Sequence, residues 1–310
     1  MSKSGKTRGP RHAKTHVFGG SWTDEKLELL SGYLKAYTTA LKGNPSKPRH
    51  FITGYIDAFA GTGSRAATRE PYAPQGAFDF PDLALPDAQH LLDGSARLAL
   101  RTEPRFDRYI FIERSPDRCA DLEGLKAEFP DLAKDILIRQ GDANAELQDL
   151  CSKDWRTRRA VLFLDPYGMQ VDWKTIEAIA ATKAIDLWLL FPLGIGVNRL
   201  LTKSGDIPAS WRRRLDLLLG TDDWYEEFHR VERQPGLFGD VEHVEKATLE
   251  TIGRYFNERL ASIFAAVAPQ PRVLKNSANN PMYLFCFAAA NERGAKIALK
   301  IANHLLTKGV

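Results

Sequence analysis

Residues 55–64 read YIDAFAGTGS, in which a short apolar run breaks into a glycine-rich turn directly after Asp57. Glycines at a strand-to-helix turn let a ligand approach the backbone closely and expose the N–H groups at the start of the helix. Residues 61–66 also satisfy the pattern G-x-G-x-x-[G/A] of dinucleotide-binding turns. A tight turn that binds nothing is the alternative interpretation of this pattern.

Five apolar runs, including this first one, predict the strands of a sheet. They cover residues 51–57, 109–113, 136–140, 160–165 and 184–191. Near-continuous apolar strands separated by helical stretches indicate a parallel sheet that is covered on both faces. Two runs near the end, 272–274 and 282–287, predict a terminal antiparallel pair. The expected fold class is therefore α/β, with a doubly wound, Rossmann-like, mostly parallel sheet.

The rest of the chain is assigned around that sheet. Its 310 residues fit one large domain or two small ones, and the strand order favours a single domain over residues 16–310. Residues 1–15 carry five basic residues and no acid, which predicts a flexible basic tail. Four prolines make residues 66–93 an expected loop insertion, and residues 194–270 are expected to be a helical region, with one long helix from about 242 to 266.

Composition excludes several classes of protein. The net charge of +4 is too small to indicate nucleic-acid binding by itself. No apolar stretch reaches the roughly 18–20 residues of a membrane span, and the N-terminus lacks the apolar segment of a signal peptide. Three distant cysteines exclude a disulfide scaffold and suggest the cytoplasm, and seven histidines without ligand spacing predict no metal site.

Four acidic residues follow four consecutive predicted strands: Asp57, Glu113, Asp142 and Asp165. The carboxyl ends of parallel strands meet at one edge of a sheet, where ligands of doubly wound folds bind. One acid after a strand is usually a helix cap, but four at successive strand ends are hard to attribute to capping alone.

These motifs together resemble class I S-adenosylmethionine-dependent methyltransferases and, more narrowly, the three-Cys-motif partner protein (TcmP) family. The matching text is GGSWT at 19–23 with Lys26-Leu27, YIDAFAGTG at 55–63, LDPYGM at 164–169 and LWLLFPLG at 187–194. The resemblance extends from about residue 16 to the end. It implies a methyltransferase-like fold, S-adenosyl-L-methionine as cofactor, and a partner protein that carries the three-cysteine motif.

The resemblance also implies roles for individual residues. Gly61 and Gly63, with Phe59 in the same motif, would lie beside the methionine part of the cofactor, and Asp57 would orient that turn or bind the ammonium group. Glu113 would hold the ribose, and Asp142 would accept from the adenine amine.

The motif Asp165-Pro166-Tyr167 resembles the D-P-P-Y motif of methyltransferases that act on base amino groups, where acid and carbonyl position the amine and the aromatic ring stacks on the base. The second proline is missing here, although the related Asp-Pro-aromatic-Gly form resembles tRNA guanine-N2 methyltransferases.

The expected function is therefore transfer of a methyl group to an exocyclic amine of a nucleic acid base, with the acceptor molecule unspecified. The shortened motif motivates an alternative, namely a catalytically silent methyltransferase-like protein that binds its three-cysteine partner. A nicotinamide-dependent oxidoreductase is disfavoured, because Glu113 lies 50 residues beyond Gly63 where the dinucleotide pattern expects about 20.

Overall fold

A computed structural model describes residues 21–42, 51–61, 94–166, 168–202, 205–236 and 239–308. Its first element is the helix α1 (Ser21–Lys42), with Asp24 in the first turn and Lys42 in the last, as the helix dipole favours. Leu30 and Leu34 are fully buried on one side of this helix. This helix therefore packs by its apolar face.

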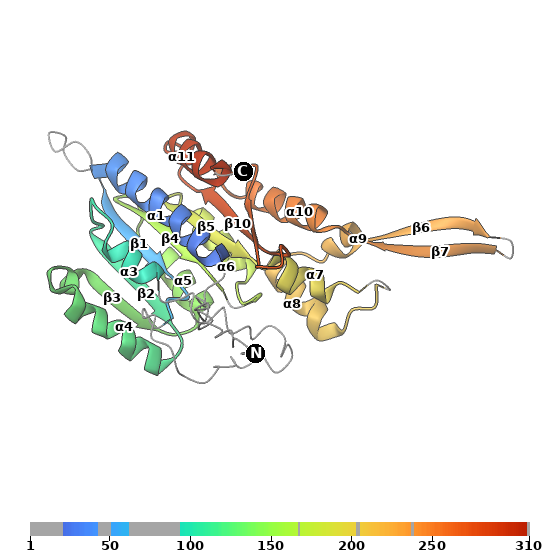
Figure 1. The fold of residues 1–310 in the computed structure, drawn as a ribbon, viewed down its shortest axis with the longest axis horizontal. Coiled ribbons are helices and arrows are strands. Elements are labelled where there is room, and N and C mark those ends of the chain that lie inside the picture. Colours follow the sequence, from blue (N-terminus) through green and yellow to red (C-terminus); the bar gives the residue numbers. More distant parts are fainter. Residues whose placement is uncertain are drawn as a thin grey trace, which may run out of the picture.

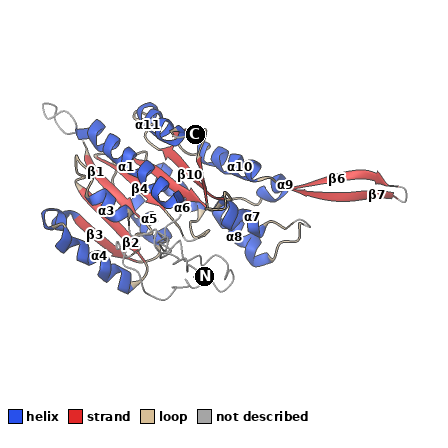
Figure 2. Ribbon diagram, in the orientation of Figure 1, coloured by secondary structure: helices blue, strands red, loops and turns tan. Residues whose placement is uncertain are grey.

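A central sheet runs through the molecule (Figures 1 and 2). Its strand order is β3-β2-β1-β4-β5-β10-β8, with β9 paired to β10. The strands are β1 (Ile52–Asp57), β2 (Arg108–Glu113), β3 (Ile136–Gln140), β4 (Arg158–Leu164), β5 (Ile185–Phe191), β8 (Ala266–Val267), β9 (Arg272–Lys275) and β10 (Pro281–Ala289). The first five are parallel, and β10 is antiparallel to β5 and to both β8 and β9. The predicted doubly wound sheet with a terminal antiparallel pair is confirmed.

Helices cover both faces of this sheet. The remaining ones are α3 (Ser95–Leu100), α4 (Pro116–Glu128), η3 (Pro130–Asp135), α5 (Ala143–Cys151), α6 (Trp173–Ala181), η4 (Leu193–Val197), α7 (Asn198–Leu200), α8 (Ala209–Leu219), α9 (Trp224–Phe228), α10 (Leu249–Ala261) and α11 (Ala295–Thr307). Side chains of α1, α3, α4 and α11 share one buried cluster with alternate strand residues such as Tyr55. Those of α5, α6, α8 and α10 share a second cluster with the intervening residues such as Ile56. The alternation places one apolar core on each face of the sheet.

The helical interpretation of residues 194–270 needs a correction. Helices α7 to α10 lie there, but so does a two-stranded antiparallel hairpin, β6 (His229–Gly236) and β7 (Gly239–Lys246), which projects from the body in Figure 1. The long helix expected from about 242 begins only at Leu249. Val241 and Val244 are three residues apart, a spacing that imitates a helical face, whereas the turn signal lies in Pro235 and Gly236.

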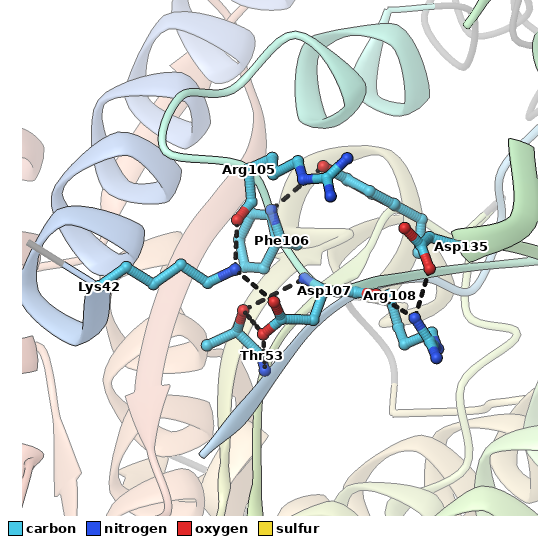
Figure 3. A network of polar contacts seen from close by, with 8 residues as sticks. Lys42, Thr53, Arg105, Phe106, Asp107, Arg108 and Asp135 are labelled. Atoms are coloured by element: carbon cyan, nitrogen blue, oxygen red, sulfur yellow. Dashed lines mark hydrogen bonds and ion pairs between the residues drawn. The ribbon is translucent and has the colours of Figure 1, made fainter. Parts of the chain in front are cut away.

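The C-terminal end of α1 is fixed to the amino end of the sheet by the polar network of Figure 3. Lys42 Nζ lies 2.7 Å from Asp107 Oδ1 and donates to the carbonyl oxygen of Arg105 at 2.6 Å. The other oxygen of Asp107 accepts from both the backbone N–H and the hydroxyl of Thr53, each at 2.8 Å. Both carboxylate oxygens therefore have protein donors.

Two expectations lie outside the described residues, namely the basic tail 1–15 and the loop insertion 66–93. In the part of the chain that the structure describes, no helix has both the length and the apolar character needed to cross a membrane.

Candidate active site

Asp57 ends β1 with a fully buried carboxylate. Its Oδ2 accepts from Ser95 Oγ at 2.6 Å and from the Tyr55 hydroxyl at 3.3 Å, and its Oδ1 accepts from the backbone N–H of Phe59 at 3.4 Å. Burial raises the pKa of Asp57 from 3.8 to about 7; the hydrogen bond from Ser95 opposes this shift and the charge of Asp165 adds to it. A carboxyl group whose pKa burial raises this far, next to the charge of Asp165, is a candidate functional group.

The glycine turn after β1 contacts the acid at the end of β2. Gly61 has φ of +62°, a conformation that glycine adopts without strain, and its N–H donates to Glu113 Oε2 at 3.1 Å. The other oxygen, Oε1, accepts from the backbone N–H of Ser115 at 2.8 Å. Each carboxylate oxygen offers two lone pairs, so the fixed Glu113 carboxylate fits the paired hydroxyls of a ribose.

Asp142 follows β3 and is exposed. It is the N-cap of α5, with Oδ1 accepting from the backbone N–H groups of Asn144 at 3.0 Å and Ala145 at 3.2 Å. Capping uses one of the two carboxylate oxygens. The expected adenine contact would therefore fall to Oδ2.

Asp165 follows the last residue of β4 and is paired with a lysine from α1. Lys26 is fully buried, and its Nζ lies 2.5 Å from Asp165 Oδ2, while the Asp165 side chain is 10% exposed. The lysine nitrogen also lies 5.6 Å from the ring centres of Trp22 and Phe163. Among the described residues, no side chain or backbone N–H other than Lys26 donates to Asp165.

The turn after Asp165 is held against the end of β5. Pro166 is buried, and Gly168 has φ of +63°, which turns the chain so that Met169 enters the core. A Cβ on Gly196 in the π-helical turn η4 would lie only 3.4 Å from Met169 Cγ. The close approach keeps the Asp165 turn beside η4, on the carboxyl side of β5.

The strand order brings Asp57, Gly61, Glu113 and Asp165 to the same edge of the sheet, because β2, β1 and β4 are adjacent and parallel. Asp142 extends this edge by one strand. Two predicted residues, Gly63 and Tyr167, lie outside the described residues. Within the described ranges, no group of three or more His, Cys, Asp or Glu side chains could hold a metal ion.

The sequence interpretation assigned no role to Lys26 or Ser95. A signal for Lys26 was available, because it lies four residues from both Trp22 and Leu30 on the apolar face of α1. A lysine in a buried helical stripe requires a counter-ion, so it points to a site. Ser95 follows the long segment after Gly61, and no local pattern connects it to Asp57.

No protein-family model and no curated protein matches the chain. Solved structures do match. A Legionella pneumophila protein of family DUF519 is 16% identical and covers 78% of this chain and 94% of its own, with a TM-score of 0.38.

Aeropyrum pernix fibrillarin with bound S-adenosyl-L-methionine is 10% identical over 86% of this chain and 76% of its own, with a TM-score of 0.30. An O-methyltransferase from Bacillus cereus is 11% identical over 74% and 91%, with a TM-score of 0.28. The likeness concerns the fold alone, a Rossmann-like α/β fold with a mostly parallel sheet.

Proposed function

We propose that the chain is an S-adenosylmethionine-dependent methyltransferase that methylates an exocyclic amine of a nucleic acid base. The observation that carries the proposal is the burial and the incomplete hydrogen bonding of the Asp165 carboxylate at the carboxyl end of β4. Its carboxylate is nearly buried, yet Lys26 is its one donor among the described residues and binds only Oδ2. A buried carboxylate with an oxygen to spare is suited to accept from a ligand.

In this proposal the acceptor amine binds at Asp165. Oδ1 of Asp165 and the carbonyl oxygen of Pro166 would accept the two N–H bonds of an amine and orient its lone pair. When bound, S-adenosylmethionine supplies a sulfonium methyl group; the nitrogen lone pair forms the new N–C bond, and the electrons of the broken C–S bond return to sulfur. The nitrogen then releases a proton to water. Placement and exclusion of water, rather than a strong base, provide much of the acceleration.

The cofactor side uses the other strand ends. Glu113 would accept from the ribose hydroxyls, Gly61 would let the methionine part pass close to the backbone, and Asp57 would face the ammonium group. Asp142 Oδ2 would accept from the adenine amine. Gly63 and Phe59 complete the same turn in this proposal, as does Tyr167 on the acceptor side.

A second candidate is a methyltransferase-like protein without turnover that binds a protein carrying the three-cysteine motif, as the TcmP resemblance implies. The Lys26–Asp165 ion pair favours it, because the acid at the catalytic position already has a counter-ion. Both candidates share the cofactor-binding edge, so the first experiment tests the edge and the second separates the candidates.

Cofactor binding is tested by calorimetry with S-adenosylmethionine and S-adenosylhomocysteine on the purified chain. We expect micromolar affinity, and a loss of at least about tenfold in Glu113→Gln and Gly61→Arg. Glu123→Gln, on the exposed surface of α4, is the matched control and should bind as the unaltered protein does. If the unaltered protein binds neither compound, the proposed function is wrong.

Turnover is tested by transfer of a labelled methyl group to unmodified ribosomal and transfer RNA and to amplified DNA. We expect label in one of these nucleic acids and none with Asp165→Ala. Cofactor binding without transfer, together with co-purification of the three-cysteine protein, would support the second candidate instead.

A further inference from the structure

The ammonium group of Lys26 is enclosed by protein. The side chain is fully buried, and Asp165 is the single anion in contact with it among the described residues. The aromatic rings of Trp22 and Phe163 enclose the ammonium group on other sides. Because an unpaired charge is very costly to bury, Lys26 is held beside Asp165 for as long as α1 stays packed.

This contact changes the charge that a ligand meets at the catalytic edge. A lone carboxylate at Asp165 would present a negative charge and would attract a cation. With Lys26 at 2.5 Å, the pair sums to zero. The neighbouring Asp57 carboxylate is fully buried and already accepts from Ser95, Tyr55 and the backbone N–H of Phe59. The Glu113 carboxylate accepts two backbone N–H groups and lies 3.9 Å from Arg118 Nη1.

We propose that Lys26 is a specificity-determining residue: it cancels the charge of Asp165, so that the site accepts a neutral amine such as that of a nucleobase and rejects a protonated alkylamine. This inference rests on the proposed function, because it assumes that the acceptor nitrogen binds at Asp165. A protonated alkylamine needs an uncompensated anion when it leaves water. A base amine needs only hydrogen-bond acceptors, which Oδ1 of Asp165 and the Pro166 carbonyl supply.

Two cofactor analogues measure this charge without knowledge of the acceptor. S-adenosylhomocysteine has nothing at the position of the transferred methyl group, whereas sinefungin has a protonated amine there. The methyl group must lie about 3 Å from the acceptor nitrogen, so the amine of sinefungin would lie near Asp165. The ratio of the two dissociation constants therefore reports the net charge at Asp165.

Calorimetry at about pH 7.5 on the full chain should give dissociation constants for the two analogues within about threefold in the unaltered protein. Lys26→Met, which leaves Asp165 unpaired, should favour sinefungin by at least about tenfold. Asp165→Asn, which leaves Lys26 unpaired, should disfavour sinefungin by a similar factor. The double variant Lys26→Met/Asp165→Asn and the conservative Lys26→Arg should both return to the original ratio.

The matched control is Tyr33→Phe. It also removes a buried polar contact of α1, the 2.6 Å hydrogen bond to Asp186, but at the other end of the sheet. The ratio of the two dissociation constants in Tyr33→Phe should equal that in the unaltered protein. This comparison separates a local effect of charge at Asp165 from a general loosening of α1.

The outcomes are distinguishable. If the unaltered protein binds neither analogue, the proposed function fails and the role of Lys26 fails with it. If both analogues bind and Lys26→Met leaves the ratio unchanged, or Tyr33→Phe shifts it equally, only the role of Lys26 is overturned. If Lys26→Met does not fold, Asp165→Asn decides: an unchanged ratio in that variant overturns the role.

Discussion

The two ends of α1 each carry a lysine that pairs with an aspartate, and the two pairs differ in how their carboxylates are used. At the amino end of the sheet, Lys42 and Thr53 together donate to both oxygens of Asp107 (Figure 3). At the carboxyl end, Lys26 donates to one oxygen of Asp165. The second pair is also the more buried, with side chains 0% and 10% exposed against 4% and 24%.

The difference in hydrogen bonding distinguishes a structural ion pair, Lys42–Asp107, from a candidate functional one, Lys26–Asp165. Both oxygens of Asp107 accept from protein donors, so this carboxylate fixes the end of α1 to the sheet. Asp165 is less exposed, and its Oδ1 has no protein donor among the described residues, so this oxygen is free to accept from a ligand. The same helix therefore anchors the fold at one end and completes the candidate site at the other.

The largest effect is expected from Lys26→Met. Removing one partner of a buried ion pair typically costs about 3–5 kcal/mol, because the other charge is left without compensation. Chemical denaturation of the purified variant measures this loss. The double variant Lys26→Met/Asp165→Asn should recover most of it, since the uncompensated charge is gone.

A loss below about 1 kcal/mol in Lys26→Met would contradict this description of the pair. It would mean that the Asp165 carboxylate is hydrated and that the lysine contributes little to the stability of the fold.

The next effect concerns pH and contrasts Asp57 with Asp107. The pKa of Asp57 is about 7 in the folded protein against the usual 3.8, so its contribution to stability is present below about pH 4 and is lost as pH rises through 7. Between about pH 5 and 8, the stability of the unaltered protein relative to Asp57→Asn should fall by about 2–3 kcal/mol. Denaturation of both proteins across this range measures the difference.

Asp107 should show the opposite sign. Burial acts to raise its pKa, but hydrogen bonds from Lys42 and Thr53 outweigh it and lower the pKa. Its contribution is therefore present above the usual value and lost only as pH falls below about 4. Burial also raises the pKa of Asp186 to about 7. Because Asp186 is present in both the unaltered protein and Asp57→Asn, its contribution cancels in the difference between their stabilities. A relative stability of Asp57→Asn that does not change between about pH 5 and 8 would contradict the first prediction.

The sequence predicts the strand ends well, and with them the positions of the acidic residues in the candidate site. Apolar runs are long enough to mark each parallel strand, so the sequence pattern alone places Asp57, Glu113 and Asp165 at one edge of the sheet. The contacts among them are not predictable in the same way. Lys26 and Asp165 are 139 residues apart, and only the packing of α1 across the sheet brings them together.

The hairpin β6–β7 was missed for a different reason. Apolar and polar residues do not alternate regularly in 229–246, and Val241 and Val244 have a helical spacing, so the sequence does not distinguish this hairpin from a helix. Local patterns therefore predict elements that pack on the core far better than elements that leave it.

The smallest effect is expected from Lys42→Met, the counterpart of the first variant. Asp107 keeps both donors from Thr53, and its side chain is partly in water, so the remaining charge is not stranded. The expected loss of stability is about 1–2 kcal/mol, well below that of Lys26→Met, when both are measured by denaturation under the same conditions.

Because Lys42 lies at the far end of α1 from the candidate site, its variant should bind S-adenosylhomocysteine and sinefungin with unaltered affinities. A loss of stability in Lys42→Met equal to that in Lys26→Met, or a changed ratio of the two affinities, would mean that both ends of α1 respond together as one rigid unit. The two ion pairs of α1 would then differ only in how deeply they are buried. The oxygen of Asp165 without a protein donor would no longer indicate a ligand site.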